Sequence, residues 1–438
     1  MPVPSGEIVA GDSPETSADG RRRRIPLAVL GLGTVSLLTD ISSESVAAVL
    51  PLYITAILGM GPLAYGFIDG IHQGISALVR IFGGWWADTT RRPKWVAFAG
   101  YAASAASRFG LLGFGGFWGV TSMVGVDRLG KGLRTGPRDS LIAVSSDPAD
   151  LGRNFGVHRA MDTTGALIGP LLALVVLALF PIGLSGYHAV FVLSAAFAVI
   201  GLAVLALMVP DLRQIRRPGA SRTDEVDVAP AHPARPRLAD MAQPQLRRLV
   251  LAAGLLGLVT IGDGFIYLAL ADQGALATHY FPLLFVGTNA AYLALAIPFG
   301  RLADRIGRAR VFLGGHLLLL VVYVLTAARF SGTAWIVLVL LLLGAFYAST
   351  DGVLAALASR MVPEESRASG ISAAQTVVAL SRFGASVGFG ILWQLGSRSL
   401  ALWVVALALA VAIPVVTWLL LRPGARDAGN AAASGVTS

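Results

Sequence analysis

The sequence predicts an all-α membrane protein of 12 transmembrane helices, arranged as two related six-helix halves. Three observations predict this fold: the composition, the number of long apolar stretches, and landmarks that recur across the middle of the chain. Of the 438 residues, 55% are hydrophobic and 13% are charged, whereas a soluble domain has roughly 25% charged residues. The mean hydropathy of +0.71 is likewise typical of a protein that resides in a lipid bilayer.

Long apolar stretches occur in two groups of six. A helix that crosses a bilayer needs about 20 mainly apolar residues. The first group covers residues 28–57, 62–86, 94–113, 115–143, 154–180 and 187–209. The second group covers residues 246–270, 279–299, 310–328, 333–358, 368–395 and 399–421.

The segments outside these stretches complete the predicted organisation. Residues 210–245 are rich in Pro, Arg and Asp and poor in apolar residues, which predicts a solvated linker. The predicted units are a disordered tail over 1–24, a six-helix bundle over 25–209, the linker, a second six-helix bundle over 246–421 and a tail over 422–438.

Basic residues gather on one side of the predicted membrane protein. They precede the first stretch at Arg21–Arg24 and fill the linker, whereas only Arg329 and Arg398 fall in the opposite loops. Because loops rich in Lys and Arg stay cytoplasmic, both termini and the linker are predicted to be cytoplasmic, in a multi-pass protein of the cell (inner) membrane. Topology thereby accounts for the net charge of +9, and no nucleic-acid partner is predicted. The arginine run also fits a cleaved signal sequence, but Asp40 and Glu44 in the first stretch and the spans that follow it favour a retained helix.

Landmarks in the first half recur in the second. Residues Gly84–Asp88 end the second stretch and Gly300–Asp304 end the eighth, while Gly165–Gly169 lie in the fifth and Gly384–Gly388 in the eleventh. The offsets of 216 and 219 residues are nearly equal. These repeats predict a duplicated six-helix unit, with a solute site near the midplane between the halves.

These landmarks resemble the signature of the major facilitator superfamily. The family's loop between the second and third helices reads G-x-L-a-D-r-x-G-r-k, and residues 300–308 follow it nearly throughout. Residues 84–93 depart from it, with Arg91 in place of glycine and Pro93 in place of a basic residue. The resemblance implies a secondary transporter that works by alternating access, with the solute site between its halves.

Two further motifs lie in the expected order. Residues 128–132 resemble the R-x-x-q-G motif, with Lys131 replacing glutamine, and Gly156, Gly165, Gly169 and Pro170 have the spacing of a motif found in antiporters, although Ala173 and Leu174 replace its final glycines. Residues 127–139 also resemble a poorly characterised bacterial branch of the superfamily.

The resemblance implies a set of gating residues. They are Gly84, Asp88, Arg92, Gly156, Gly165, Gly169, Pro170, Gly300, Asp304, Arg305 and Arg308. We expect Asp88 and Asp304, with their adjacent arginines, to hold the cytoplasmic side closed, and Pro170 to bend the fifth helix. The alternatives are a solvated topology signal for the acids and simple tight packing for Gly165 and Gly169.

Ionisable residues inside the stretches are the candidates for proton coupling or solute binding, because they are costly when they face lipid. The candidates are Asp40, Glu44, Asp69, Asp127, Arg128, Lys131, Arg134, Arg138, Asp139, Arg159, Asp162, Asp263, Asp351 and Arg382. Arg80 and Arg108 also lie in the stretches, where snorkelling or pairing is an equally good interpretation. Most of these charges lie in the first half, which predicts that the first half holds the charge chemistry.

Spacing narrows these candidates. Asp40 and Glu44 are four residues apart and share one helix face, and two carboxylates in a poorly hydrated cavity favour proton uptake. The alternative is a permanent ion pair between these acids and the fourth stretch. Arg159 and Asp162 are three residues apart, and are expected to pair with each other or with the fourth stretch.

Basic residues form one stripe along the fourth stretch. Asp127, Lys131, Arg134 and Arg138 recur at helical spacing. Because arginine suits carboxylate and phosphate groups, the stripe predicts an anionic solute. Complete pairing of the stripe with acids of the protein is the alternative.

The predicted function is therefore a proton-coupled antiporter that exports a small, possibly anionic organic solute, with the lipid bilayer as its surroundings and no obligate protein partner. The alternatives are an importer of an organic anion, a multidrug efflux pump for lipophilic compounds, and a membrane sensor that does not transport. The chain has no cysteine, no phosphate-cradling G-x-x-x-x-G-K-[ST] loop and no H-E-x-x-H motif. Neither an enzyme, a cofactor, a metal nor direct ATP drive is predicted.

Overall fold

The computed structural model describes residues 25–90, 92–181, 183–211, 244–273, 277–330, 332–358 and 367–421. Every regular element in these ranges is helical. The first half comprises α1 (Leu27–Leu52) with the π-helical turn η1 (Tyr53–Ile57), α2 (Pro62–Thr90), α3 (Pro93–Gly113), α4 (Gly116–Val144), the short η2 (Pro148–Asp150), α5 (Leu151–Leu179) and α6 (Leu184–Met208). The second half comprises α8 (Pro244–Leu258), α9 (Asp263–Ala271), η4 (Thr278–Tyr280), α10 (Pro282–Ile306), α11 (Arg308–Ala327), α12 (Thr333–Ala358), α13 (Arg367–Leu395) and α14 (Arg398–Leu421). The all-α prediction is confirmed, and each predicted stretch corresponds to a helix or a pair of helices.

Length and apolar composition mark nine spans in the described part of the chain, with α8 and α9 counted as one. The three long helices that are not marked are α2, α3 and α4, because small, polar and charged residues lower their hydropathy. The tails and nearly all of the predicted linker lie outside the described residues.

The seventh predicted stretch is interrupted. The helix stops at Leu258 and resumes at Asp263, although α8 and α9 together form one candidate span over Pro244–Ala271, as predicted. In a bilayer, freed backbone groups must find partners within the protein. The buried hydroxyl of Tyr323 supplies them: it accepts the N–H of Ile261 at 3.0 Å and donates to the carbonyl of Val259 at 3.1 Å.

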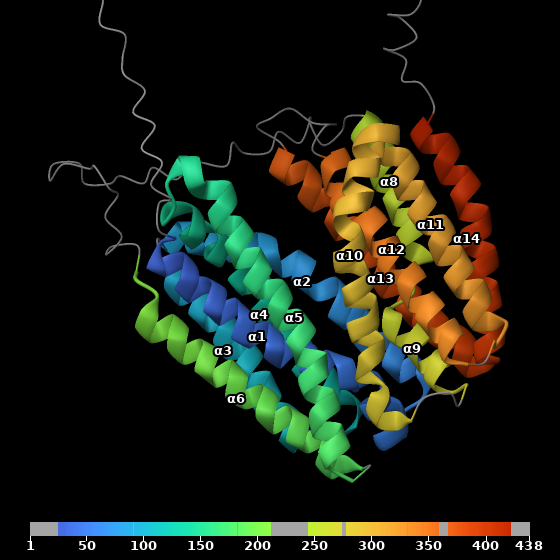
Figure 1. Ribbon diagram of the computed structural model, residues 1–438, viewed down its shortest axis with the longest axis horizontal. Coiled ribbons are helices and arrows are strands. Elements are labelled where there is room, and N and C mark those ends of the chain that lie inside the picture. The colour runs from blue at the N-terminus through green and yellow to red at the C-terminus, as the bar shows by residue number, and fades with distance from the viewer. Residues whose placement is uncertain are drawn as a thin grey trace, which may run out of the picture.

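The two halves form separate bundles that diverge on one side of the molecule and meet on the other (Figure 1). The helices α6 and α14 end, and α8 begins, on the diverging side (Figure 1). Across the interface, α2 packs against α13 and α5 packs against α10. Glycine permits the first of these contacts, since a Cβ at Gly390 would lie 2.8 Å from the carbonyl oxygen of Pro62. Small residues of this kind let membrane helices approach closely.

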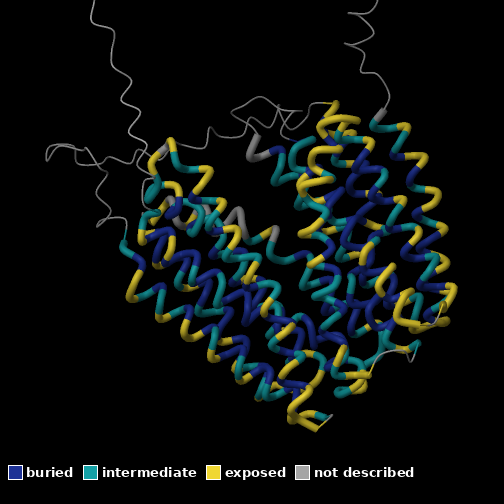
Figure 2. The backbone as a smooth tube through the Cα atoms, in the orientation of Figure 1, coloured by how far each residue is buried: buried dark blue, intermediate teal, exposed yellow. Residues whose placement is uncertain are grey.

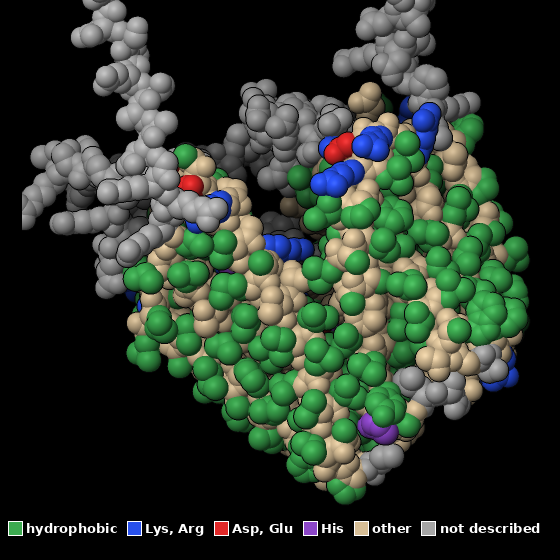
Figure 3. Space-filling model, viewed as in Figure 1, with side chains coloured by type: hydrophobic (Ala, Val, Ile, Leu, Met, Phe, Trp, Pro, Cys, Tyr) green, Lys and Arg blue, Asp and Glu red, His purple; other side chains and the backbone are tan. Residues whose placement is uncertain are grey.

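Each bundle has a buried interior and an apolar exterior. Buried residues run along the inner sides of the helices, and exposed residues lie on the outer faces (Figure 2). On the visible face of the molecule, hydrophobic side chains cover most of both bundles, and charged side chains gather at the rim of the diverging side and in the hollow between the halves (Figure 3). This distribution is that of a multi-pass membrane protein.

Candidate functional site

A charged cavity of about 310 Å³ lies between the halves, where α1, α4 and α5 face α10. Lys and Arg side chains are visible in the hollow between the bundles (Figure 3). The charged residues that line the cavity are Asp40 and Glu44 from α1, Lys131, Arg134 and Arg138 from α4, and Arg159 and Asp162 from α5. Seven predicted site residues are therefore brought together.

The acids and bases of the cavity face one another at long distances. Lys131 Nζ lies 4.0 Å from Glu44 Oε1, and Arg134 Nη2 lies 3.9 Å from Asp40 Oδ1. Arg138 Nη1 lies 3.8 Å from Asp162 Oδ1. A charge-assisted N–H···O bond is normally about 2.7–2.9 Å long. Lys131 and Arg134 consequently feel nearby negative charge but keep donors available for another anion.

The predicted stripe along α4 is not uniform. The Lys131 side chain is 37% exposed, whereas Arg134 is only 4% exposed and lies 4.5 Å over the ring of Tyr101. Arg138 is intermediate, and both its Nε and Nη2 donate to Asp139 at 3.0 Å. Arg159 is exposed and has no ion pair among the described residues. Lys131 and Arg159 are therefore the most accessible bases for a solute.

Asp127 does not neutralise the bases of the cavity. Its two carboxylate oxygens accept hydrogen bonds from Arg108 Nη2 and Arg128 Nη2, each at 2.6 Å. The Arg108 guanidinium also donates to Ser42 and Ser43 on α1. For Arg108 the sequence allowed either snorkelling or pairing, and the structure shows a buried ion pair with Asp127 of α4. Asp127 therefore neutralises arginines that lie outside the cavity.

Two of the cavity acids, Asp40 of α1 and Asp162 of α5, line the same cavity from neighbouring helices. Two carboxyl groups can share a hydrogen bond only when one of them carries a proton. The position is therefore suited to hold a proton beside the bases, although the spacing of Asp40 and Glu44 had pointed to those two acids as the pair.

The remaining predicted acids lie at the interface with the second half. Asp69 on α2 accepts a 2.5 Å hydrogen bond from Ser386 on α13, and it packs against Gly262 in the break before α9. Asp263 accepts a 2.6 Å hydrogen bond from the hydroxyl of Tyr347.

Arg382 and Asp351 complete this interface group. Asp351 is exposed, and Arg382 Nε is buried without a hydrogen-bond partner among the described residues. Ionisable residues inside the protein are thus not confined to the first half: Asp69 of the first half lies at the interface with Asp263, Asp351 and Arg382 of the second.

The predicted gating residues of the loop motifs have different surroundings. Arg308 pairs with Asp304 at 3.1 Å and donates to the carbonyl of Ala356 at 3.3 Å. Gly300, Arg305 and Arg92 are exposed, and the surroundings of Gly84 and Asp88 are not described. The Asp304–Arg308 pair is local and exposed, a kind of pair that contributes about 0–1 kcal/mol.

The predicted glycines of α5 also differ. A Cβ at Gly169 would lie 2.8 Å from the backbone oxygen of Ile41, and one at Gly165 would meet the backbone of Leu37. Gly156 faces open space. The helix continues through the buried Pro170. Gly165 and Gly169 therefore place α5, with Asp162, directly against α1.

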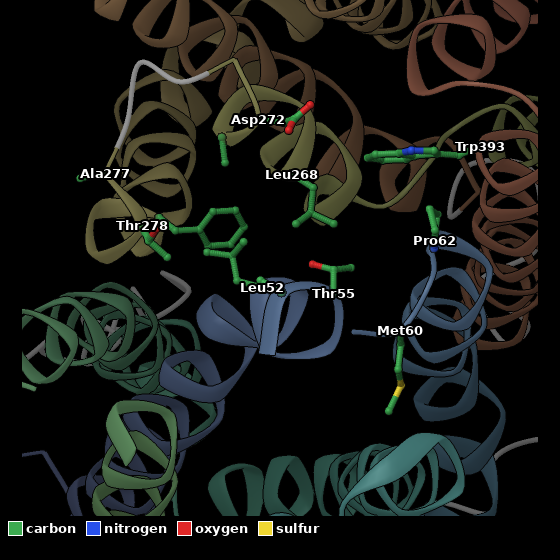
Figure 4. A pocket seen from close by; sticks show the side chains of 12 residues that line it. Leu52, Thr55, Met60, Pro62, Leu268, Asp272, Ala277, Thr278 and Trp393 are labelled. Carbon is green, nitrogen blue, oxygen red and sulfur yellow. The ribbon is translucent and has the colours of Figure 1, made fainter. Parts of the chain in front are cut away.

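A second pocket, of about 470 Å³, lies where the two halves meet. Leu268 of the second half faces Thr55 of the first (Figure 4), and Trp393 and Met60 also contribute to the lining. Asp272 is the charged residue of its lining, and it pairs with Arg398. None of the described lining residues is basic, which separates this pocket from the charged cavity.

Sequence reasoning missed several uncharged members of these sites. Asn289 and Tyr292 on α10 line the charged cavity, and Ser386 and Tyr347 hold the interface acids. These side chains are uncharged and lie outside the family motifs. The signal that could have found the missed residues is a polar side chain within an otherwise apolar stretch.

The sequence is similar to those of known membrane transport proteins. The model of the Major Facilitator Superfamily matches residues 32–283 and 249–437. An uncharacterised MFS-type transporter of Methanocaldococcus jannaschii is 30% identical over 385 residues, which cover 86% of this chain and 91% of that protein. An uncharacterised protein of Mycobacterium tuberculosis is 29% identical over 382 residues, which cover 86% of this chain and 89% of that protein.

Solved structures share the fold at low sequence identity. A variant of the nucleoside transporter NupG superposes with a TM-score of 0.73 at 15% identity, over 90% of this chain and 99% of that one. A bacterial homologue of the iron transporter ferroportin, in an inward-facing state, gives a TM-score of 0.65 at 18% identity, over 90% of this chain and 99% of that one.

Proposed function

The chain belongs to the major facilitator superfamily and is a secondary transporter, and we propose that it carries a small organic anion together with protons by alternating access. The observation that carries the proposal is the charge of the cavity. Four bases and three acids line it, and Asp139 pairs with Arg138 just outside the lining, so that the group is formally neutral and becomes +1 when Asp40 or Asp162 takes up a proton. Bases in a poorly hydrated cavity require anionic partners.

Size and polarity favour a metabolite over a lipophilic drug. The cavity volume of about 310 Å³ is at the lower end of the roughly 300–1,000 Å³ that is typical of ligand sites. Among the described residues, the aliphatic side chains of the lining are those of Ala166, Leu167 and Leu293. A lipophilic cation would find little apolar surface there, and four bases would repel it.

The position of the acids favours movement of the anion and protons in the same direction. Asp40, Glu44 and Asp162 each lie about 4 Å from a base, so that an ionised acid competes with an anionic solute for that base. Protonation of the acid removes the competitor. Proton binding and anion binding then strengthen each other, as linkage requires, and an inward proton gradient would drive uptake.

Export by proton antiport is the second candidate. The glycines of α5 favour it, because Gly165 and Gly169 have the spacing of the antiporter motif and bring α5 against α1. Both candidates keep the cytoplasmic placement of the termini and linker. The cavity would then open toward the cytoplasm, since the bundles diverge on the side where α6 ends and α8 begins (Figure 1).

The test is transport by the full-length protein in proteoliposomes that contain a pH dye. Labelled carboxylates and phosphorylated metabolites are compared with lipophilic cations, with an imposed proton gradient of either sign. Symport predicts that anion entry acidifies the lumen, whereas antiport predicts that it makes the lumen more alkaline. Accumulation of cations in place of anions would refute the anion assignment.

A matched pair of variants locates the site. Lys131→Gln removes an accessible base of the cavity and is expected to weaken anion binding about tenfold, the lower end for a hydrogen bond to a charged group. Arg248→Gln removes an exposed base of α8 that does not line the cavity, and transport should remain as in the wild type. Equal effects of the two changes would contradict the placement of the site.

A further inference from the structure

The uncharged polar lining of the cavity is unevenly used. Thr135 and Thr163 donate their hydroxyl hydrogens to carbonyls of their own helices, at 2.7 and 2.8 Å. Asn289 and Tyr292 line the same cavity, and neither side chain has a hydrogen-bond partner among the described residues. An amide and a phenol together offer donors and acceptors, so α10 presents free hydrogen-bonding groups to whatever occupies the cavity.

The orientation of α10 is fixed by its other side. The hydroxyl of Thr288 is hydrogen bonded to that of the buried Tyr267 at 2.8 Å. A Cβ at Gly344 of α12 would lie 2.9 Å from the carbonyl oxygen of Thr288, so glycine is needed for α12 to approach this closely. Asn289 and Tyr292 are three residues apart and share a helix face. Packing on α12 therefore holds both side chains at the cavity.

The charged and uncharged groups of the cavity come from different halves of the protein. Lys131 and Arg159 belong to α4 and α5, whereas Asn289 and Tyr292 belong to α10. A solute changes the balance between conformations only through contacts that differ between them. A solute that contacts both groups would link the two halves, which is what alternating access requires of it.

We propose that Asn289 and Tyr292 hydrogen-bond the uncharged part of the solute, so that the transported anion carries a hydroxyl or amide group opposite its acidic head. This rests on the proposed function, in which the bases hold the acidic head. The expected substrates are hydroxylated or amidated small carboxylates and phosphates. Anions with a purely hydrocarbon body are expected to bind less well, since they leave the polar groups of α10 without partners.

The experiment measures equilibrium binding to the purified full-length protein in nanodiscs. The probes are three pairs of carboxylates that differ by one hydroxyl: succinate and malate, butyrate and 3-hydroxybutyrate, and benzoate and 4-hydroxybenzoate. The proteins are the wild type, Asn289→Ala, Tyr292→Phe and Lys131→Gln. Tyr280→Phe is the matched control, because Tyr280 is exposed in η4 and does not line the cavity.

The wild type is expected to prefer the hydroxylated member of at least one pair. Tyr292→Phe or Asn289→Ala should reduce that preference about two- to tenfold, the value of one neutral hydrogen bond, and leave the affinity for the other member unchanged. Lys131→Gln should weaken both members equally, and Tyr280→Phe should change neither.

Two results would overturn the inference, and they are distinguishable. The inference fails if Asn289→Ala and Tyr292→Phe both keep the preference for the hydroxylated carboxylate, or if they weaken the binding of both members of a pair equally. If Lys131→Gln still weakens the binding of anions in that case, the proposed function stands. If the wild type binds none of the six carboxylates and transports no labelled phosphorylated metabolite in the proteoliposome assay, the anion assignment itself fails and the inference fails with it. Tyr292→Phe keeps the ring, so a loss of folding is not expected to obscure the result.

Discussion

Replacement of Gly165 by alanine is expected to destabilise the protein more than replacement of Gly156 by alanine. Gly156 and Gly165 belong to the same helix and the same antiporter-like motif. A Cβ at Gly156 meets nothing within 4 Å, whereas a Cβ at Gly165 would lie closer than 3.0 Å to the carbonyl oxygen of Leu37 and within 3.1 Å of two further Leu37 backbone atoms. Backbone cannot rotate away, so α1 and α5 must separate.

The magnitude follows from comparison of the two variants. Alanine is favoured over glycine in a helix by about 0.8–1.0 kcal/mol, and this gain is common to Gly156→Ala and Gly165→Ala. The difference between them therefore isolates the steric cost at α1. Overpacking of this kind costs about 1–3 kcal/mol, so Gly165→Ala should be less stable than Gly156→Ala by that amount. At roughly 2 °C per kcal/mol for a large domain, the separation in Tm is about 2–6 °C.

The assay is thermal unfolding of both purified variants in the same detergent, followed by intrinsic fluorescence. Proteoliposome transport measured alongside should fall more for Gly165→Ala, because Asp162 and Arg159 lie on the displaced helix. Equal Tm values for the two variants would refute the close approach of α1 and α5 at this position. A lower Tm for Gly156→Ala would contradict the open surroundings of that residue.

Two further changes test the polar interior. Tyr323→Phe removes the hydroxyl that serves both backbone groups in the break between α8 and α9, and should cost about 1–3 kcal/mol of stability; an unchanged Tm would show that the break has other partners. Asp127→Asn leaves the buried Arg108 and Arg128 without their shared carboxylate, and should cost about 3–5 kcal/mol. We expect poor yield of folded protein by size-exclusion chromatography, which the further change Arg108→Gln should partly restore, and normal yield of Asp127→Asn would refute the pairing.

The sequence by itself determined the helices of this protein and their duplicated order. Apolar length is a local property, and the bilayer imposes a nearly constant requirement on it. The predicted start of the first stretch at residue 28 and the end of the last at 421 consequently agree with α1 and α14 within one residue. The sequence also predicted which residues share one face of a helix. Lys131, Arg134 and Arg138 have the spacing of one helix face, and they line one cavity.

Only the tertiary structure decided which side chains meet. Asp127 pairs with Arg108 and not with the bases of the cavity, Asp69 reaches Ser386 across the interface of the halves, and Asn289 of α10 faces the bases of α4 and α5. These contacts depend on which helices are neighbours and on how each helix is rotated. Glycines set the neighbours and the rotations, because they let α5 lie on α1 and α12 lie on α10. The sequence shows where a glycine stands, but only the structure shows which helix packs against it.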